Sequence, residues 1–492
     1  VSTEQCAGRD RSKMEAGGVA VALVCVATAA WFLHMVFKWN RTSGAMQFPG
    51  SRGLPIIGES FEFFKSTPSL ELIPFLKRRF ERYGPIFRTN LIGEDLIVSL
   101  DPEFNTYIFQ QEEKLFHIWY PDSFMRILGE DNVINVLQSL HKHIKVLVLR
   151  LFGPRNLSRV LLGDIQRTAE ASLRSWLQQP SIELKDATSS MVFSITAKRL
   201  IGYDSATADD NLLEHFTAFS HGLIAFPIYL PGTAFYKCMQ SRKHIMKTLR
   251  KLFDERKKAV DVEREYVDFI DILIDDIKEG RPEMSEKIGL DLIVLLLFAS
   301  SETTSSAMTI ILRFLTDNPK ALQELTEEHE GIRQRRATPD SEITWEEYKS
   351  MKFTSHVIHE ALRLASIAPV MFRRAIEDVQ IKGYTIPKGS KIMISPAATH
   401  LNPKIYEDPH VFNPWRWQNS AEPVGSASKD FMAFGGGVRL CVGADLSKLQ
   451  MSIFLHCLVT KYRWKTIKGG SMVLSPGLRF PDGFHIQLLQ KA

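Results

Sequence analysis

The sequence predicts a mainly α-helical fold with a small β region, an α+β class. Most of the chain after residue 60 carries the 3.6-residue apolar period of helices. Two segments, 86–100 and 379–395, instead carry the short apolar runs and turn residues of β-hairpins. No repeat or low-complexity linker divides residues 60–490. We therefore expect one large domain, residues 59–492, in which the helices and the small sheet share a core.

Composition excludes several classes of protein. Of the 492 residues, 45% are apolar and 24% are charged, which is an ordinary globular balance. The net charge is only +5, and Lys and Arg are interleaved with Asp and Glu, so we expect no nucleic-acid partner. The five cysteines are few and widely spread, which argues against a disulfide framework and for a reducing compartment.

The N-terminal region predicts a membrane anchor. Residues 1–16 form an extension, and we interpret its polar part, before Met14, as an expression remnant or translated upstream sequence. Residues 17–37 are almost entirely apolar, and about 21 helical residues span roughly 31 Å, the thickness of a bilayer core. A cleaved signal peptide is the alternative. Residues 38–58 follow as a linker with a proline-rich hinge, Phe48–Pro55, which cannot continue the helix.

Basic residues predict the orientation of this anchor. If Met14 starts the chain, Lys38 and Arg41 keep the following domain cytosolic by the positive-inside rule. If the preceding residues are native, their own basic side chains oppose that orientation.

The helices and strands are expected in a definite order. The predicted helices are 69–82, 137–152, 159–177, 185–201, 210–224, 235–258, 287–316, 318–333 and 353–365. The predicted strands are 86–91 and 96–100 in one hairpin, and 379–381, 384–386 and 391–395 in a second. The apolar stretch 290–315 contains Asp291 and Glu302, which indicates a buried central helix rather than a second membrane span.

A glycine-rich loop presents a single cysteine. Phe434 to Gly443 contains three consecutive glycines, then Arg439 and Cys441, and a helical run follows. A helix N-terminus and a nearby arginine favour thiolate over thiol. One thiolate cannot make a zinc site, which needs about four ligands, whereas a lone axial thiolate suits haem iron. The alternative is a glycine turn beside a buried, inert cysteine.

Polar residues interrupt the central apolar helix at Ala299–Thr304. Consecutive Ser and Thr hydroxyls can bond backbone carbonyls, bend the helix and admit water. Glu302 beside Thr303 places an acid next to a hydroxyl, a pair suited to proton delivery. Thr304 lies about 100° further round the helix, so it should point away if Thr303 faces the site.

Two further pairs share a helix face. Glu360 and Arg363 are three residues apart, and Arg416 follows in an aromatic setting; a surface ion pair is the default interpretation of such spacing. His141 and Lys145 are four residues apart, and a solvated basic face is the alternative there.

The pattern Phe-x-x-Gly-x-Arg-x-Cys-x-Gly resembles the haem-binding loop of the cytochrome P450 superfamily. Phe434, Gly437, Arg439, Cys441 and Gly443 stand at its positions. The resemblance covers roughly residues 48–490 and implies the cytochrome P450 fold. It also implies haem b as cofactor, with the Cys441 thiolate as the iron ligand.

The other motifs occur in the order of that family. Ala299 to Thr304 resembles its oxygen-activation motif, with Ser300 in place of the usual Gly, which implies catalytic roles for Glu302 and Thr303. Glu360, Arg363 and Arg416 resemble its structural triad. The resemblance implies further that Arg373 (or its neighbour Arg374), His141 and Lys145 hold the haem propionates, and that Arg439 also binds the cofactor. It implies that the substrate pocket is lined by Ala299, Val370, Met371 and Phe372.

Two stretches, residues 434–445 and 226–235, resemble those of the plant clan that oxidises sterols, triterpenoids and terpenoid hormones. This implies hydroxylation of an apolar terpenoid with O2 and electrons from an NADPH-dependent reductase, at the endoplasmic reticulum membrane. The apolar loop 226–235 is then a flap dipped in membrane lipid, or a loop packed on the core. The alternatives are a haem-thiolate isomerase or dehydratase that needs no O2, a non-enzymatic haem-binding membrane protein, and an anchored interaction protein without haem.

Overall fold

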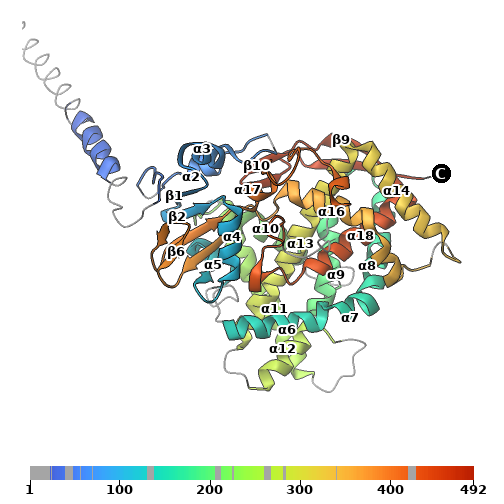
Figure 1. Ribbon diagram of the computed structural model, residues 1–492. Helices are drawn as coiled ribbons and strands as arrows, with labels where there is room; N and C mark the ends of the chain where they lie inside the picture. The colour runs from blue at the N-terminus through green and yellow to red at the C-terminus, as the bar shows by residue number, and fades with distance from the viewer. Residues whose placement is uncertain are drawn as a thin grey trace, which may run out of the picture.

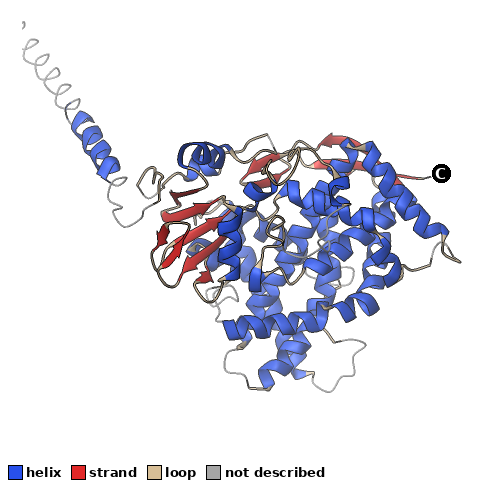
Figure 2. Cartoon of the chain, viewed as in Figure 1, coloured by secondary structure: helices blue, strands red, loops and turns tan. Residues whose placement is uncertain are grey.

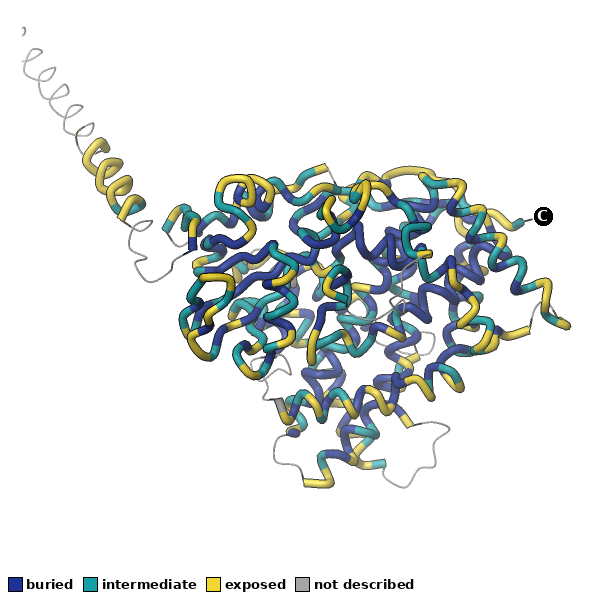
Figure 3. The backbone as a smooth tube through the Cα atoms, in the orientation of Figure 1, coloured by how far each residue is buried: buried dark blue, intermediate teal, exposed yellow. Residues whose placement is uncertain are grey.

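The computed structural model shows a broad helical body with a sheet at one side (Figure 1). It describes residues 23, 25–38, 48–55, 57–68, 70–129, 138–204, 212–223, 227–259, 267–280, 284–338, 341–418 and 428–491. Of the predicted anchor, residues 17–22 and 24 lie outside this part. The helix Cys25–Lys38 projects away from the body, and Figure 3 shows it almost wholly exposed.

Helices dominate the part of the chain that the structure describes. Figure 2 shows them filling most of the body. The α-helices are α2 (Ser60–Phe63), α3 (Pro74–Tyr83), α4 (Pro102–Gln110), α5 (Asp122–Leu128), α6 (Gln138–Phe152), α7 (Pro154–Asn156), α8 (Leu162–Leu177), α9 (Leu184–Ile201), α10 (Leu212–Leu223), α11 (Ala234–Lys258), α12 (Phe269–Lys278), α13 (Glu286–Asp317), α14 (Pro319–Gln334), α15 (Trp345–Ser350), α16 (Lys352–Ala365), α17 (Pro396–His400) and α18 (Ala444–Lys461).

In the described residues the strands are short and form four small sheets. They are β1 (Ile86–Leu91), β2 (Glu94–Ser99), β3 (Phe116–Ile118), β4 (Ile182–Glu183), β5 (Met371–Ala375), β6 (Val379–Ile381), β7 (Tyr384–Ile386), β8 (Lys391–Ile394), β9 (Tyr462–Gly469), β10 (Val473–Ser475), β11 (Gly477–Arg479) and β12 (Phe484–Gln490). The predicted class, mainly α with a small β region, is confirmed.

Helix α13 lies in the middle of the helical body (Figure 1). Ser285 caps its N-terminus by accepting a hydrogen bond from the Ile288 N–H (3.3 Å). Most of its side chains are buried, and α9, α11, α16 and α18 pack around it. As predicted, this stretch is a core helix despite being long and apolar enough to cross a membrane.

The largest sheet has the order β1-β2-β8-β5-β3 and combines distant parts of the chain. β1 and β2 form the predicted first hairpin, with Leu91 opposite Glu94 and positive φ at Ile92 and Gly93 in the turn. β8 pairs in parallel with β2, and Leu96 lies opposite Lys391. The second predicted hairpin is therefore only partly correct. β6 and β7 do pair, but β8 leaves them for the large sheet because its apolar residues fill that sheet's core.

Several element boundaries differ from the prediction. The helix expected at 69–82 begins only at Pro74, whose ring fits the first helical turn. The helix expected from 159 begins with a π-helical turn, Leu157–Leu161, before α8. Helices α4, α5 and α12 were not predicted, because stretches of ten residues or fewer give too little apolar period to recognise.

Candidate active site

The cysteine loop is held between α4 and the start of α18. Gly437 has φ +65°, and a Cβ there would lie 2.2 Å from the Phe109 carbonyl oxygen, so only glycine fits. The Cys441 N–H donates to the Phe434 carbonyl oxygen (3.1 Å) and closes the turn. The local backbone therefore fixes Cys441 immediately before α18.

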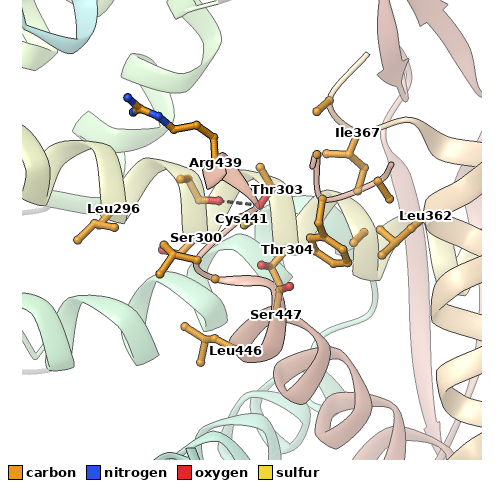
Figure 4. A pocket seen from close by; sticks show the side chains of 18 of the residues that line it. Leu296, Ser300, Thr303, Thr304, Leu362, Ile367, Arg439, Cys441, Leu446 and Ser447 are labelled. Carbon is orange, nitrogen blue, oxygen red and sulfur yellow. Dashed lines mark hydrogen bonds between the residues drawn. The ribbon is translucent and has the colours of Figure 1, made fainter. Parts of the chain in front are cut away.

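Cys441 opens onto a cavity of about 350 Å³ (Figure 4). Apolar side chains make up most of the wall, and α13 contributes Thr303 and Thr304 on one side. Arg373 and Arg439 bring two positive charges to the same cavity. The cavity thus joins one sulfur, an apolar wall and two guanidinium groups.

The surroundings of Cys441 act on the pKa of its thiol in opposite directions. Cys441 is accessible to water because it faces the cavity, yet it lies deep inside the protein. Burial raises the pKa of the Cys441 thiol, while the Gly443 N–H and the Lys448 ammonium lower it less. The groups at the start of α18 thus act toward the thiolate, as expected, while burial opposes them. A metal cation at the sulfur would reverse the balance.

Both threonines of the central helix line this cavity. The expectation that Thr304 points away from the side of Thr303 is wrong, because the cavity is wide enough to touch both positions (Figure 4). The Thr303 hydroxyl donates to the Ala299 carbonyl oxygen (2.6 Å), one turn earlier. The Ser301 hydroxyl likewise donates to the Leu297 carbonyl oxygen (2.7 Å). These hydroxyls bond the carbonyls of their own helix, as expected for such a run.

Glu302 lies on a different side of α13. Its Oε1 is 2.5 Å from the Lys185 Nζ on α9, and both side chains line a second cavity of about 680 Å³. Glu302 is absent from the described wall of the Cys441 cavity. The structure therefore does not bring the Glu302 carboxylate and Cys441 to the same cavity.

The two cavity arginines are paired with acids that the sequence analysis did not single out. Arg373 Nη2 donates to Glu112 Oε2 at 2.9 Å. Arg439 Nη2 lies 3.4 Å from Glu113 Oε1, and its Nε lies 3.9 Å from Glu112 Oε1. All four side chains are almost fully buried. Arg374, the alternative to Arg373, is exposed.

His141 and Lys145 lie on α6 near this arginine cluster but outside the described cavity wall. Burial lowers the pKa of His141 to about 4, and the positive charges of Arg439 and Lys145 add to the effect. His141 is therefore neutral at physiological pH.

The structure brings Glu360, Arg363 and Arg416 together in the core. Arg363 donates twice to the Glu360 carboxylate, from Nε (2.9 Å) and Nη2 (2.8 Å). Arg416 Nε donates to Glu360 Oε1 (3.0 Å), and Trp417 Nε1 donates to Oε2 (3.0 Å). Glu360 and Arg363 are fully buried, so the alternative of a surface ion pair is excluded.

The predicted substrate-contacting residues divide into two groups. Ala299, Val370 and Met371 line the Cys441 cavity. Phe372 is absent from the described wall and packs edge-on against Trp119 and Tyr120 (5.7 and 5.6 Å between ring centroids).

Sequence reasoning missed other wall residues. Leu296 and Ala307 line the cavity from the same face of α13 as Ser300 and Thr304, and their spacing of three or four residues could have found them. Tyr120 lines it from the segment before α5, and no sequence signal pointed to it.

The residues present fit a haem. The sulfur and the apolar wall match an iron ligand and a macrocycle. Arg373 and Arg439 suit two carboxylates, and Arg373 Nε has no hydrogen-bond acceptor in the described part of the protein.

Comparison with known proteins identifies the family. The family model "Cytochrome P450" matches residues 48–482. "Cytochrome P450 87A3" of Oryza sativa subsp. japonica is 53% identical over 93% of this chain and 89% of its own length. "Cucurbitadienol 11-hydroxylase" of Siraitia grosvenorii is 40% identical over 94% of this chain and 97% of its own length. A "Steroid (22S)-hydroxylase" of Oryza sativa subsp. indica is 37% identical over 89% of this chain and 87% of its own length.

A solved structure has a similar fold. "Retinoic acid bound cyanobacterial CYP120A1" superposes with a TM-score of 0.79 at 27% identity, over 90% of this chain and 99% of that one. The resemblance inferred from the motifs is thus confirmed. The chain belongs to the cytochrome P450 family of haem-thiolate monooxygenases, oxidoreductases with haem b that use O2 and electrons from a redox partner to oxidise apolar substrates.

Proposed function

We propose that this enzyme hydroxylates an apolar terpenoid of the sterol or triterpenoid class. The observation that carries the proposal is the cavity at Cys441, where an apolar wall meets the threonines of α13. Such a wall selects a large apolar substrate, because few polar groups are available to orient a hydrophilic one. The relatives support the class, since one is named for cucurbitadienol and another for steroids.

The haem is held, in this proposal, by residues from three parts of the chain. Cys441 ligates the iron from the loop that Phe434 and Gly437 shape. Arg373 and Arg439 bind the propionates, and Lys145 adds positive charge while His141 offers a neutral donor. When bound, the haem activates O2 for insertion of one oxygen atom into a C–H bond. The protein's task is to place that C–H bond and to exclude water.

Proton delivery is assigned to α13. Thr303 presents its hydroxyl to the Cys441 cavity, where it can hold and pass a proton. Glu302 faces the second cavity, where its carboxylate pairs with the Lys185 ammonium, and it would collect protons from that side. The two residues are neighbours in sequence, so α13 separates a proton source from the reacting centre.

We also propose the cellular setting. Residues 17–37 cross the endoplasmic reticulum membrane once, residues 38–58 act as the linker and hinge, and the catalytic domain, 59–492, is cytosolic. Ile228, Tyr229 and Leu230 are strongly exposed before α11 and would dip into the lipid surface. Phe226 of the same predicted flap lies outside the described residues. Electrons then come from an NADPH-dependent reductase in the same membrane.

A spectral binding screen tests the substrate class. Purified protein is titrated with sterols, triterpenes and diterpenes, and binding is followed by the shift of the haem Soret band. We expect sterols or triterpenes to bind and to be hydroxylated only with O2, NADPH and reductase. Turnover that needs neither O2 nor NADPH would instead indicate an isomerase or dehydratase. Failure of every terpenoid to bind would overturn the substrate proposal.

A further inference from the structure

Glu112 is an unexpected acid beside the cavity arginines. It follows α4, and its carboxylate is fully buried. Glu112 Oε2 accepts from Arg373 Nη2 (2.9 Å), and Oε1 lies 3.9 Å from Arg439 Nε. One buried carboxylate therefore lies between the two guanidinium groups that reach the cavity.

The charge at this edge of the cavity is already balanced by the protein. Arg373 and Arg439 carry two positive charges, and Glu112 and Glu113 supply two carboxylates. Burial raises the pKa of the Glu112 carboxyl, and the Arg373 and Arg439 guanidinium groups oppose that rise. Two haem propionates added here would make the edge negative, in a region where charges interact strongly.

We propose that Glu112 is a positioning residue for the haem: it holds Arg373 at the cavity and, as a buried negative charge, keeps the reduction potential of the haem low. Reduction adds an electron to the iron, and a nearby fixed negative charge opposes this step. The Glu112 carboxylate has a second function in this arrangement, because its bond to Nη2 orients the guanidinium and leaves Nε for another acceptor. This inference rests on the proposed roles of Arg373 and Arg439.

The test compares two Glu112 variants with an exposed control. Glu112→Gln keeps the size of the side chain and removes its charge, whereas Glu112→Asp keeps the charge and shortens the side chain. Glu103→Gln is the control, since Glu103 lies in the first turn of α4 with its side chain 80% exposed and pairs only with Lys382 among the described residues. The haem midpoint potential is measured by spectroelectrochemical titration of each full-length holoenzyme.

We expect a shift to more positive potential in Glu112→Gln, a smaller shift in Glu112→Asp and none in Glu103→Gln. Haem loss from Glu112→Gln but not from Glu112→Asp would also support the role of the charge. An unchanged potential in haem-loaded Glu112→Gln, or equal effects in both Glu112 variants, would overturn the inference.

The variant Arg373→Gln distinguishes a failure of this inference from a failure of the proposed propionate contacts. Loss of haem affinity in Arg373→Gln, together with no effect of Glu112→Gln, would leave the propionate assignment standing and refute only the role of Glu112. If Arg373→Gln binds haem normally, the propionate assignment itself fails, and the inference fails with it.

Discussion

At the residue scale, Cys441 gives the most direct prediction. Cys441→Ser should abolish the red-shifted carbon-monoxide band of thiolate-ligated haem, because a hydroxyl is a poor replacement for a thiolate on iron. The measurement is the reduced carbon-monoxide difference spectrum of purified protein. Cys457→Ser is the control. Cys457 is buried within α18, away from the cysteine loop, and burial raises the pKa of its thiol to about 12. A normal band in Cys441→Ser would mean that another residue is the ligand.

Thr303 gives a second residue-scale prediction. Thr303→Ala should retain haem and substrate binding but form less product per NADPH, with hydrogen peroxide released in its place. The loss could reach about 100-fold, the lower end of general acid–base contributions. Thr303→Ser should restore most of the coupling, because it keeps the hydroxyl.

The matched variant is Thr304→Ala, which removes a hydroxyl from the same cavity wall. Both variants are compared by product, peroxide and NADPH consumed. A loss confined to Thr304→Ala would transfer the proton-delivery role to Thr304.

Residue identities were easier to predict than side-chain directions. The motifs that contain Thr303, Arg373 and Cys441 resemble those of one family, and that resemblance was enough to indicate a common site; all three residues line one cavity. The direction of Glu302 could not be predicted, because its partner Lys185 lies 117 positions away along the chain. Glu112 was missed for the same reason: its buried partner Arg373 is 261 positions away.

At the scale of elements, the glycine loop and α4 act as one unit. Gly437→Ala should destabilise the folded protein, since positive φ alone costs about 1–2 kcal/mol for a residue with a Cβ. The contact with the Phe109 carbonyl oxygen would add to that cost. Thermal unfolding and haem release measure the effect.

Gly443→Ala provides the control within the same loop. Gly443 has ordinary negative φ (−90°), and a Cβ there would meet the Cys441 sulfur only at 3.9 Å. We expect a clearly smaller fall in melting temperature than for Gly437→Ala. Equal effects would show that the approach of α4 does not constrain the loop.

Long elements were predictable and their pairing was not. The apolar period over α13 and α11 is long enough to identify both helices from sequence. β8 was predicted in a local hairpin but pairs with β2 and β5 in the large sheet. A local sequence pattern contains no information on these distant partners.

At the scale of the whole molecule, the anchor and the catalytic domain should be separable. Removal of residues 1–43 should leave a folded, haem-loaded domain, because the described core begins at Phe48. That domain should still bind lipid vesicles weakly through Ile228, Tyr229 and Leu230. Vesicle sedimentation and the carbon-monoxide spectrum measure the two properties.

The control carries Ile228→Ser and Leu230→Ser in the truncated protein. It should hold haem equally well and lose the residual vesicle binding. A truncated protein that cannot hold haem would show that the domain boundary is wrong, and unchanged vesicle binding in the double variant would place the lipid contact elsewhere.

The parallel pairing of β2 with β8 has a consequence for biosynthesis. Leu96 can pair with Lys391 only after the ribosome has synthesised the intervening stretch of about 300 residues. At about 5–20 residues per second, this synthesis takes roughly 15–60 s. During that interval the β1–β2 hairpin emerges with one edge unpaired, which is a surface prone to aggregation. The nascent chain should therefore depend on chaperones that cover this edge until β8, about four fifths of the way along the chain, has been synthesised.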